Sequence, residues 1–324
     1  MEGAYYNGQY LNRLERLGYS QAEIDNKLES TFEEMFYGPE GVRLCHFAGP
    51  DMMYIEDTGN HDVRTEGMSY AMMFCVQMNR QKEFDCLWRW VATHMYLTEG
   101  ENAGYFAWSC HTDGSKNSDG PAPDGEELFA MSLFLAANPW GSGEGVLDYA
   151  SWARRILHAC VHKGEEAGSG FPMWNPENHL IKFVPNCEFT DPSYHLPHFY
   201  ELFALWSDEC DRPFWHAAAA ASRQYLRKAC HARTGLSAEY AEYDGRPHRG
   251  DQPDRHDWFF SDAYRTLGNI ALDAQWFGDK DGWAHETAAH IQQFFEEKDI
   301  ADRIQHLILP VTVVVMGHLW YYAY

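Results

Sequence analysis

Residues 66–80, with the sequence EGMSYAMMFCVQMNR, decide the fold class of this chain. The segment is rich in Met and Ala, and only its first and last residues carry a charge. A helix that is apolar around its whole circumference is buried in a protein interior. The next segment predicts a helix with one apolar face, marked at helical spacing by Phe84, Leu87, Trp88, Val91 and Met95. The predicted unit is therefore a buried helix covered by a one-sided helix.

This unit repeats along the chain. Apolar helices are expected to begin near residues 66, 124, 191 and 257, and helices with a charged face near 83, 146, 211 and 281. An earlier helix follows the capping box that runs from Ser20 to Glu23. The later helices are expected over residues 124–137, 146–162, 191–206, 211–230, 257–276 and 281–297. Strict alternation of an inner and an outer layer predicts an all-α toroid of helical hairpins, an (α/α) barrel.

No linker or low-complexity tract divides the 324 residues, so we expect a single domain over residues 1–324. Short strands are expected only around residues 182–184 or 236–240. The last stretch differs from the rest, because residues 311–315 form a β-branched run that is poor helix material. We therefore expect the barrel to be incomplete after about residue 300, with an exposed apolar seam beside the first hairpin.

Charge excludes two classes of partner. The chain has 25 basic and 48 acidic residues and a formal net charge of −23. Phosphate backbones and anionic lipids would repel such a polyanion, so neither nucleic acid nor a membrane surface is expected to bind. The longest apolar run, residues 307–316, is shorter than the roughly 20 residues of a membrane-spanning helix and contains Pro310.

Cysteine usage and the start of the chain indicate a location. The eight cysteines form no C-x-x-C pair, and no secretion signal is visible before them. These features are typical of reduced thiols in a cytoplasmic protein. Aromatic residues are unusually abundant, with 12 Trp, 19 Tyr and 19 Phe. Since aromatic faces are platforms for the flat apolar faces of sugars, a carbohydrate-binding cleft is an early hypothesis.

Each predicted inner helix has a polar residue at or near its first turn, and these four residues lie about 60 to 70 positions apart: Glu66, Asp124, Tyr194 and Asp262. Hairpins of similar length that close into a ring would bring all four helix starts to one rim. Taken singly, each acid is expected as a helix cap, because the first turn favours Asp and Glu by about 0.3–1 kcal/mol. The apolar residues that follow Glu66 and Asp262 favour a second role, because a carboxyl group beside a dry interior tends to keep its proton.

Four motifs carry a resemblance that extends from about residue 10 to about residue 300: DTGNHDVRTEGMSY at 57–70, PAPDGEE at 121–127, FTDPSYHLP at 189–197 and FSDAYR at 260–265. Together they resemble glycoside hydrolase family 8. The resemblance implies an (α/α)6 barrel that hydrolyses β-1,4 glycosidic bonds with inversion. Within the family, the chain is most similar to enzymes that release xylose from the reducing end of short xylo-oligosaccharides. Such an oligosaccharide is therefore the expected partner.

The resemblance also assigns roles to the four residues. It implies that Glu66 is the general acid, that Asp262 is the general base, and that Tyr194 helps to hold the attacking water. Asp124 matches the aspartate that binds the distorted sugar. The physical logic agrees, because inverting hydrolysis needs an acid and a base about 6.5–9.5 Å apart with room for water.

Further residues are candidate substrate contacts. Trp108, Tyr105 and Trp174 lie in predicted loops or near helix ends, where tryptophan and tyrosine rings can serve as sugar platforms. Arg64 and Arg265 flank the predicted acids and could tune them, although pairing with acidic neighbours is the simpler role.

No metal or cofactor is expected. The His195–His198 pair is interrupted by Pro197, which breaks helical geometry, and no third ligand is evident.

Two alternatives remain open at this point. An endo-acting xylanase or β-glucanase of the same family would need a groove that is open on the leaving-group side, which an altered C-terminal segment allows. A catalytically impaired remnant would bind carbohydrate without turnover if the ring does not close. Neither His306 nor His318 can be assigned as a histidine that recognises the reducing end, and the sequence leaves the oligomeric state open.

Overall fold

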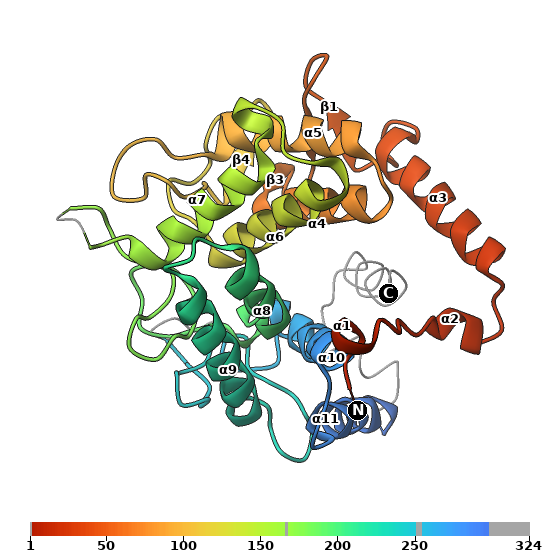
Figure 1. Ribbon diagram of the computed structural model, residues 1–324, viewed down its shortest axis with the longest axis vertical. Helices are drawn as coiled ribbons and strands as arrows, with labels where there is room; N and C mark the ends of the chain where they lie inside the picture. Colours follow the sequence, from red (N-terminus) through yellow and green to blue (C-terminus); the bar gives the residue numbers. More distant parts are fainter. Residues whose placement is uncertain (1, 166–167, 251–254, 298–324) are drawn as a thin grey trace.

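The computed structural model describes residues 2–165, 168–250 and 255–297, and this part of the chain is mostly helical (Figure 1). Two short helices, α1 (Ala4–Asn7) and α2 (Arg13–Arg16), come first. The longer helices are α3 (Gln21–Tyr37), α4 (Thr65–Gln77), α5 (Gln81–Trp90), α6 (Pro123–Trp140), α7 (Tyr149–His162), α8 (Pro197–Trp206), α9 (Arg212–Ala229), α10 (Arg265–Phe277) and α11 (Trp283–Glu296). Each helix that the sequence predicts in this part of the chain is thus present.

Helix α3 begins at the predicted capping box. The Ser20 hydroxyl accepts a hydrogen bond from the Glu23 amide at 3.3 Å, and the Glu23 carboxylate accepts one from the Ser20 amide at 2.8 Å. These two bonds satisfy backbone donors that the start of a helix otherwise leaves unpaired. Further along α3, the rings of Phe32 and Phe36 stack at a centroid distance of 4.1 Å and join the main core.

The predicted alternation of layers is confirmed. The first three turns of α6, residues 123–134, are buried on every side, whereas α5 buries one face and exposes the other. Contacts join the hairpins α4–α5, α6–α7, α8–α9 and α10–α11, and other contacts join the inner helices α4 to α6, α6 to α8 and α8 to α10. One large apolar core extends from α3 to α10.

Two inner helices begin later than the sequence predicts. The expected helix 191–206 is divided into a 3-10 turn at Pro192–Tyr194 and α8, because the residue before Pro197 is held out of the helical region (φ −116°, ψ 66°). The expected helix 257–276 likewise begins as a 3-10 turn at Ser261–Tyr264 that leads into α10. Tyr194 and Asp262 therefore lie in short turns that precede the inner helices.

Two β-hairpins were not predicted. Strand β1 (Cys45–Phe47) pairs antiparallel with β2 (Met53–Ile55), and β3 (Asp62–Arg64) pairs antiparallel with β4 (Ser109–His111). The strands that the sequence places near 182–184 and 236–240 are absent from the described residues. Only isolated bridges occur beside those positions, Trp174 with Ile181 and Thr190 with Ala241. Segments of three residues are too short for an alternating pattern to show.

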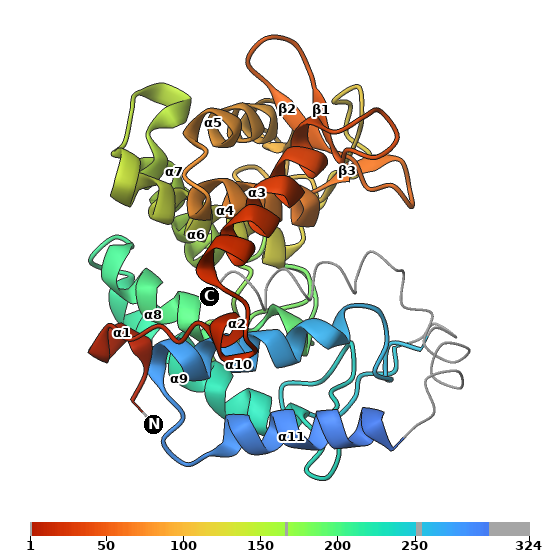
Figure 2. The same cartoon turned by 90° about the vertical axis from the view of Figure 1, so that its right-hand side faces the viewer.

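The start of the chain packs on α10, as both ribbon views show (Figures 1 and 2). Glu2 forms a bridge with Gly278, and the rings of Tyr5 and Phe277 lie 5.0 Å apart. The expected incomplete closure after about residue 300 and the candidates His306 and His318 lie outside the described residues. Nowhere in residues 2–165, 168–250 and 255–297 is a helix both long and apolar enough to cross a membrane. All eight cysteines are free thiols, as predicted.

Candidate active site

The predicted acid lies where α4 and α6 touch. Glu66 is in the first turn of α4, and Asp124 follows the proline that begins α6. Between the two helices, a Cβ atom added to Gly125 would lie 2.6 Å from the Cβ of Thr65. Only a glycine allows this approach, so Gly125 is what brings the two carboxyl groups into one site.

This contact gives a prediction for Gly125→Ala. The added methyl group must push the two helix starts apart, so we expect a loss of about 1–3 kcal/mol in the free energy of unfolding, together with lower activity. Urea denaturation measures the first effect. Gly268→Ala in α10 is the matched control, because nothing lies within 4 Å of its Cβ position. That control is expected to stabilise the fold by about 0.4–1 kcal/mol. A Gly125→Ala protein as stable as wild type would contradict the contact.

Arg265 joins the other residues of the site. Its guanidinium lies 2.9 Å from an Asp124 carboxylate oxygen and 2.8 Å from an Asp262 carboxylate oxygen. It also donates a hydrogen bond to the Tyr70 hydroxyl at 3.1 Å and lies 5.6 Å from the centre of the Tyr194 ring. The sequence predicts a pairing role for Arg265. It does not predict that Arg265 lies among four groups of the site.

The carboxyl groups of the site differ in their surroundings. Burial, and then the negative charge of Asp124, raises the pKa of Glu66 to about 7, although Arg265 opposes this rise. Burial also raises the pKa of Asp124, and its ion pair with Arg265 opposes that shift. The Asp262 side chain is 40% exposed and faces the Arg265 cation. With a pKa of about 7, the carboxyl group of Glu66 can hold a proton near neutral pH, as a general acid must.

Tyr194 is a buried phenol on a firmly held turn. Asp191 accepts a hydrogen bond from the Ser193 amide at 2.6 Å, and Asn269 of α10 donates one to the Ser193 carbonyl at 2.7 Å. The Tyr200 hydroxyl lies 3.1 Å from the Tyr194 carbonyl oxygen. Burial, and then the charge of Asp124, raises the pKa of Tyr194 well above its usual value. Tyr194 therefore keeps its proton and can donate a hydrogen bond.

The four predicted residues thus come from four different inner elements and lie around one cation. Asp124 and Asp262 share Arg265, and the charge of each raises the pKa of Glu66. The pKa of Tyr194 responds to both Asp124 and Glu66. Two of the four residues, Tyr194 and Asp262, lie in turns that precede their helices.

Trp108 lies beside the start of α4, where Glu66 is located. Its carbonyl oxygen accepts a hydrogen bond from the Thr65 amide at 3.0 Å, and its ring is only partly buried. The Arg64 guanidinium lies 5.1 Å from the centre of this ring and pairs with Asp57 at 3.2 Å and Asp62 at 3.0 Å. Arg64 therefore fixes the orientation of the indole through ion pairs on the preceding strand and turn.

The structure corrects two of the predicted substrate contacts. Tyr105 is fully buried, and its hydroxyl donates to the backbone carbonyls of Ala159 (3.1 Å) and Phe171 (2.9 Å). Trp174 is 1% exposed and packs edge-on against Trp215 at 5.0 Å. Neither ring has a face free for a sugar, so both belong to the core.

The two histidines near Tyr194 have separate environments. His195 is held by Ser222 at 2.8 Å and by Thr190 at 3.0 Å, whereas His198 packs against Trp276. Burial lowers the pKa of both rings to about 3, so both are neutral parts of the core.

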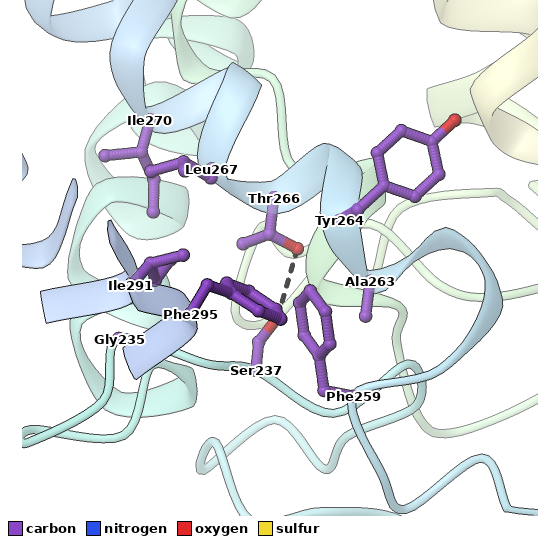
Figure 3. Close-up of a pocket in the computed structure, with 10 residues that line it drawn as sticks. All are labelled: Gly235, Ser237, Phe259, Ala263, Tyr264, Thr266, Leu267, Ile270, Ile291 and Phe295. Carbon is purple, nitrogen blue, oxygen red and sulfur yellow. Dashed lines mark hydrogen bonds between the residues drawn. The ribbon is translucent and has the colours of Figure 1, made fainter. Parts of the chain in front are cut away.

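A cavity of about 240 Å³ lies next to Ala263 and Tyr264, the two residues that follow Asp262 in the chain (Figure 3). It is lined mainly by apolar groups of α10, α11 and Phe259, and the Ser237–Thr266 hydrogen bond of 3.2 Å crosses one wall. No carboxyl group lines this cavity, so it is not the predicted catalytic site. Ser261, the residue before Asp262, has a strained φ of 42°.

A carboxyl group that holds its proton near neutrality, a second carboxylate and a phenol around one cation define an acid–base hydrolase. The chain belongs to the glycosyl hydrolases of family 8, whose family model matches residues 19–311.

The chain is similar to several named proteins. It is 54% identical over 302 residues to the reducing end xylose-releasing exo-oligoxylanase of Halalkalibacterium halodurans, an alignment that covers 93% of this chain and 76% of that protein. It is 54% identical to Rex8A of Paenibacillus barcinonensis, with 95% and 80% covered. The structure of Rex8A complexed with xylose matches with a TM-score of 0.90, covering 93% of this chain and 79% of that one. A more distant relative, endoglucanase 2 of Ruminiclostridium josui, is 27% identical over 86% of this chain and 56% of its own length.

Proposed function

We propose that this chain is an inverting glycoside hydrolase that releases xylose from the reducing end of short β-1,4-xylo-oligosaccharides. One observation carries the chemistry: burial and the charge of Asp124 keep Glu66 protonated near pH 7, while Asp262 faces Arg265 across the same site. The 54% identity to two reducing-end xylose-releasing exo-oligoxylanases supports the substrate and the direction of attack.

The reaction is a single displacement. Glu66 donates its proton to the glycosidic oxygen, and the bond from that oxygen to the anomeric carbon breaks. Asp262 removes a proton from a water molecule, whose oxygen attacks the anomeric carbon from the opposite face. The new reducing end is therefore the α-anomer. Both proton transfers are of the kind that contributes about 10²–10⁴-fold to a rate.

The other polar groups position the reactants. The hydroxyl of Tyr194, which keeps its proton, donates a hydrogen bond that holds the attacking water. Asp124, in its ion pair with Arg265, binds the distorted sugar. Because Arg265 pairs with Asp262 as well, it also orients the base. Trp108, held by Arg64, provides the platform for a neighbouring sugar ring.

The same proposal includes the architecture and the location. An (α/α)6 barrel in a single domain, incomplete after about residue 300, accounts for the alternation of inner and outer helices, and the similarity to solved family 8 structures supports this architecture. The free cysteines support a cytoplasmic enzyme that acts on imported oligosaccharides.

Incubation with xylotriose tests the proposal. We expect xylose and xylobiose in equal amounts, with the α-anomer of xylobiose first in proton NMR spectra. Endo action, the first alternative, would instead give longer fragments from polymeric xylan or β-glucan. Binding of xylotriose without any product would identify the chain as a carbohydrate-binding remnant. Either of these outcomes would overturn the proposed activity.

The raised pKa of Glu66 gives a prediction for the pH profile. The acid must be protonated, so kcat/KM for xylotriose should be high below about pH 7 and fall about tenfold per pH unit above it. Initial rates between about pH 5 and about pH 9 measure this limb. A profile that is flat through neutrality would show that Glu66 does not supply the proton.

A further inference from the structure

Three side chains of the types that can bind metals meet in the outer layer of the fold, where α7 ends and α9 begins. His158 and His162 are one helical turn apart at the end of α7, and Asp211 immediately precedes α9. One ligand atom from each of the three lies within 4.8 Å of the other two. The proposed chemistry of the carboxyl groups uses none of these residues.

The Asp211 carboxylate is buried and only half satisfied. The side chain is about 1% exposed. Its first oxygen is 2.7 Å from Nε2 of His162 and accepts a hydrogen bond from the Cys210 thiol at 3.3 Å. Its second oxygen has no hydrogen-bond partner in the described part of the chain and lies 3.6 Å from Nδ1 of His158. A buried carboxylate oxygen without a partner is costly, so the arrangement calls for a cation.

The Nδ1 side of the His162 ring also has surroundings that are typical of a metal-binding histidine. Nδ1 of His162 lies 2.6 Å from a Glu165 carboxylate oxygen, while its Nε2 faces Asp211. Metal-binding histidines commonly donate their second ring N–H to a carboxylate in this way, which fixes the tautomer and the ring orientation. The rings of His158 and His162 lie 4.4 Å apart, so both can face one ion.

From these contacts we propose that His158, His162 and Asp211 bind one divalent transition-metal ion of the Zn²⁺ type, with water in the remaining position. Two imidazoles favour such an ion over Mg²⁺ or Ca²⁺, which prefer oxygen ligands. Ligands about 2.0–2.2 Å from a tetrahedral ion lie roughly 3.4 Å from one another. The separations of the two histidines from Asp211, 2.7 and 3.6 Å, bracket that value, and all three ligand atoms lie within 4.8 Å of one another, so side-chain rotations can complete the site.

The ion would connect two outer helices that belong to consecutive hairpins. Because the three ligands come together only in the folded chain, binding stabilises the fold in proportion to the logarithm of the free ion concentration. The alternative is a simple ion-pair network, in which a protonated His162 bridges Asp211 and Glu165. The two arrangements differ in what they require of His158, which contributes to the metal site and very little to the network.

The test is Zn²⁺ binding by the full chain after removal of metals with a chelator. We expect one Zn²⁺ per chain in competition with a chromophoric chelator, and a higher melting temperature with Zn²⁺. Replacing Glu165 by Gln should weaken binding by about 10–100-fold, and His158→Gln and His162→Gln should weaken it more. His158 is 56% exposed, so its replacement is expected to leave the fold intact.

His216→Gln is the matched control, since that histidine is 76% exposed on α9 and outside the cluster. It should bind Zn²⁺ as tightly as wild type. Absence of stoichiometric binding by the wild-type chain would overturn the proposal. So would equal affinity in the His158→Gln and His216→Gln variants, which would show that the cluster is an ion-pair network only.

Discussion

Replacement of Glu66 by Gln is expected to lower kcat for xylotriose by about 10²–10⁴-fold. The amide has nearly the same shape as the acid but carries no proton that it can give to the glycosidic oxygen. The fold should survive, because Gln fills the same space as Glu and the single described hydrogen bond of the side chain comes from the hydroxyl of Thr65 at 3.3 Å. Initial rates on xylotriose and the melting temperature are the two measurements.

The substrate provides the sharpest control for this variant. β-Xylobiosyl fluoride has a leaving group that needs little help from an acid, so the Glu66→Gln enzyme should hydrolyse it far better than xylotriose. Glu286→Gln, at an exposed position in the first turn of α11, is the matched protein control and should keep wild-type rates. If Glu66→Gln loses activity equally on both substrates, the side chain has a role in binding or folding and not in proton donation.

Hydrophobic periodicity predicts the helices well, because the burial of a helix determines which of its positions are apolar. Residues 67–77 and 128–137 contain no charged side chain, and both stretches belong to inner helices. The exact starts of two other inner helices escape this reasoning. Pro197 excludes the helical conformation from the residue before it, and Ser261 adopts a left-handed conformation. Both effects concern single backbone angles, which a periodic pattern does not record.

The sequence does not predict which individual aromatic residues are buried. Trp108 and Tyr105 lie three positions apart in the same segment, yet one ring is partly exposed beside the acid and the other is fully buried. The difference arises from backbone carbonyls of α7 and of residue 171 that happen to face the Tyr105 hydroxyl. A local signal for such a long-range contact does not exist.

The central place of Arg265 has the same origin. Its proximity to Asp262 follows from a spacing of three residues, but its ion pair with Asp124 joins positions 141 residues apart. Only the packing of α10 near the start of α6 creates that pair. The His158–His162 pair shows the opposite case, since a spacing of four on a helix could have drawn attention to it, whereas its partner Asp211 becomes evident only in three dimensions.

Replacement of Asp262 by Asn is expected to reduce kcat on xylotriose by at least as much as the loss of the acid, about 10²–10⁴-fold, because the amide cannot accept a proton from water. The variant also removes one of the two carboxylates that pair with Arg265. Asp281→Asn is the matched control, since it removes an exposed ion pair with Arg227 and should leave kcat unchanged. Exposed pairs of that kind contribute about 0–1 kcal/mol to stability.

The pH dependence of the residual activity of Asp262→Asn provides a second, independent measurement. In the wild-type chain the charge of Asp262 raises the pKa of Glu66, and Arg265 lowers it. Without that negative charge, and with Arg265 less neutralised, the pKa of Glu66 must fall. The decline of the rate with increasing pH should therefore begin at a lower pH than in wild type. If Asp262 were too far from Glu66 to influence its charge, the pH at which the rate declines would be the same in the variant and in wild type. That result would show that the two carboxyl groups do not share one site, and it would contradict the proposed mechanism.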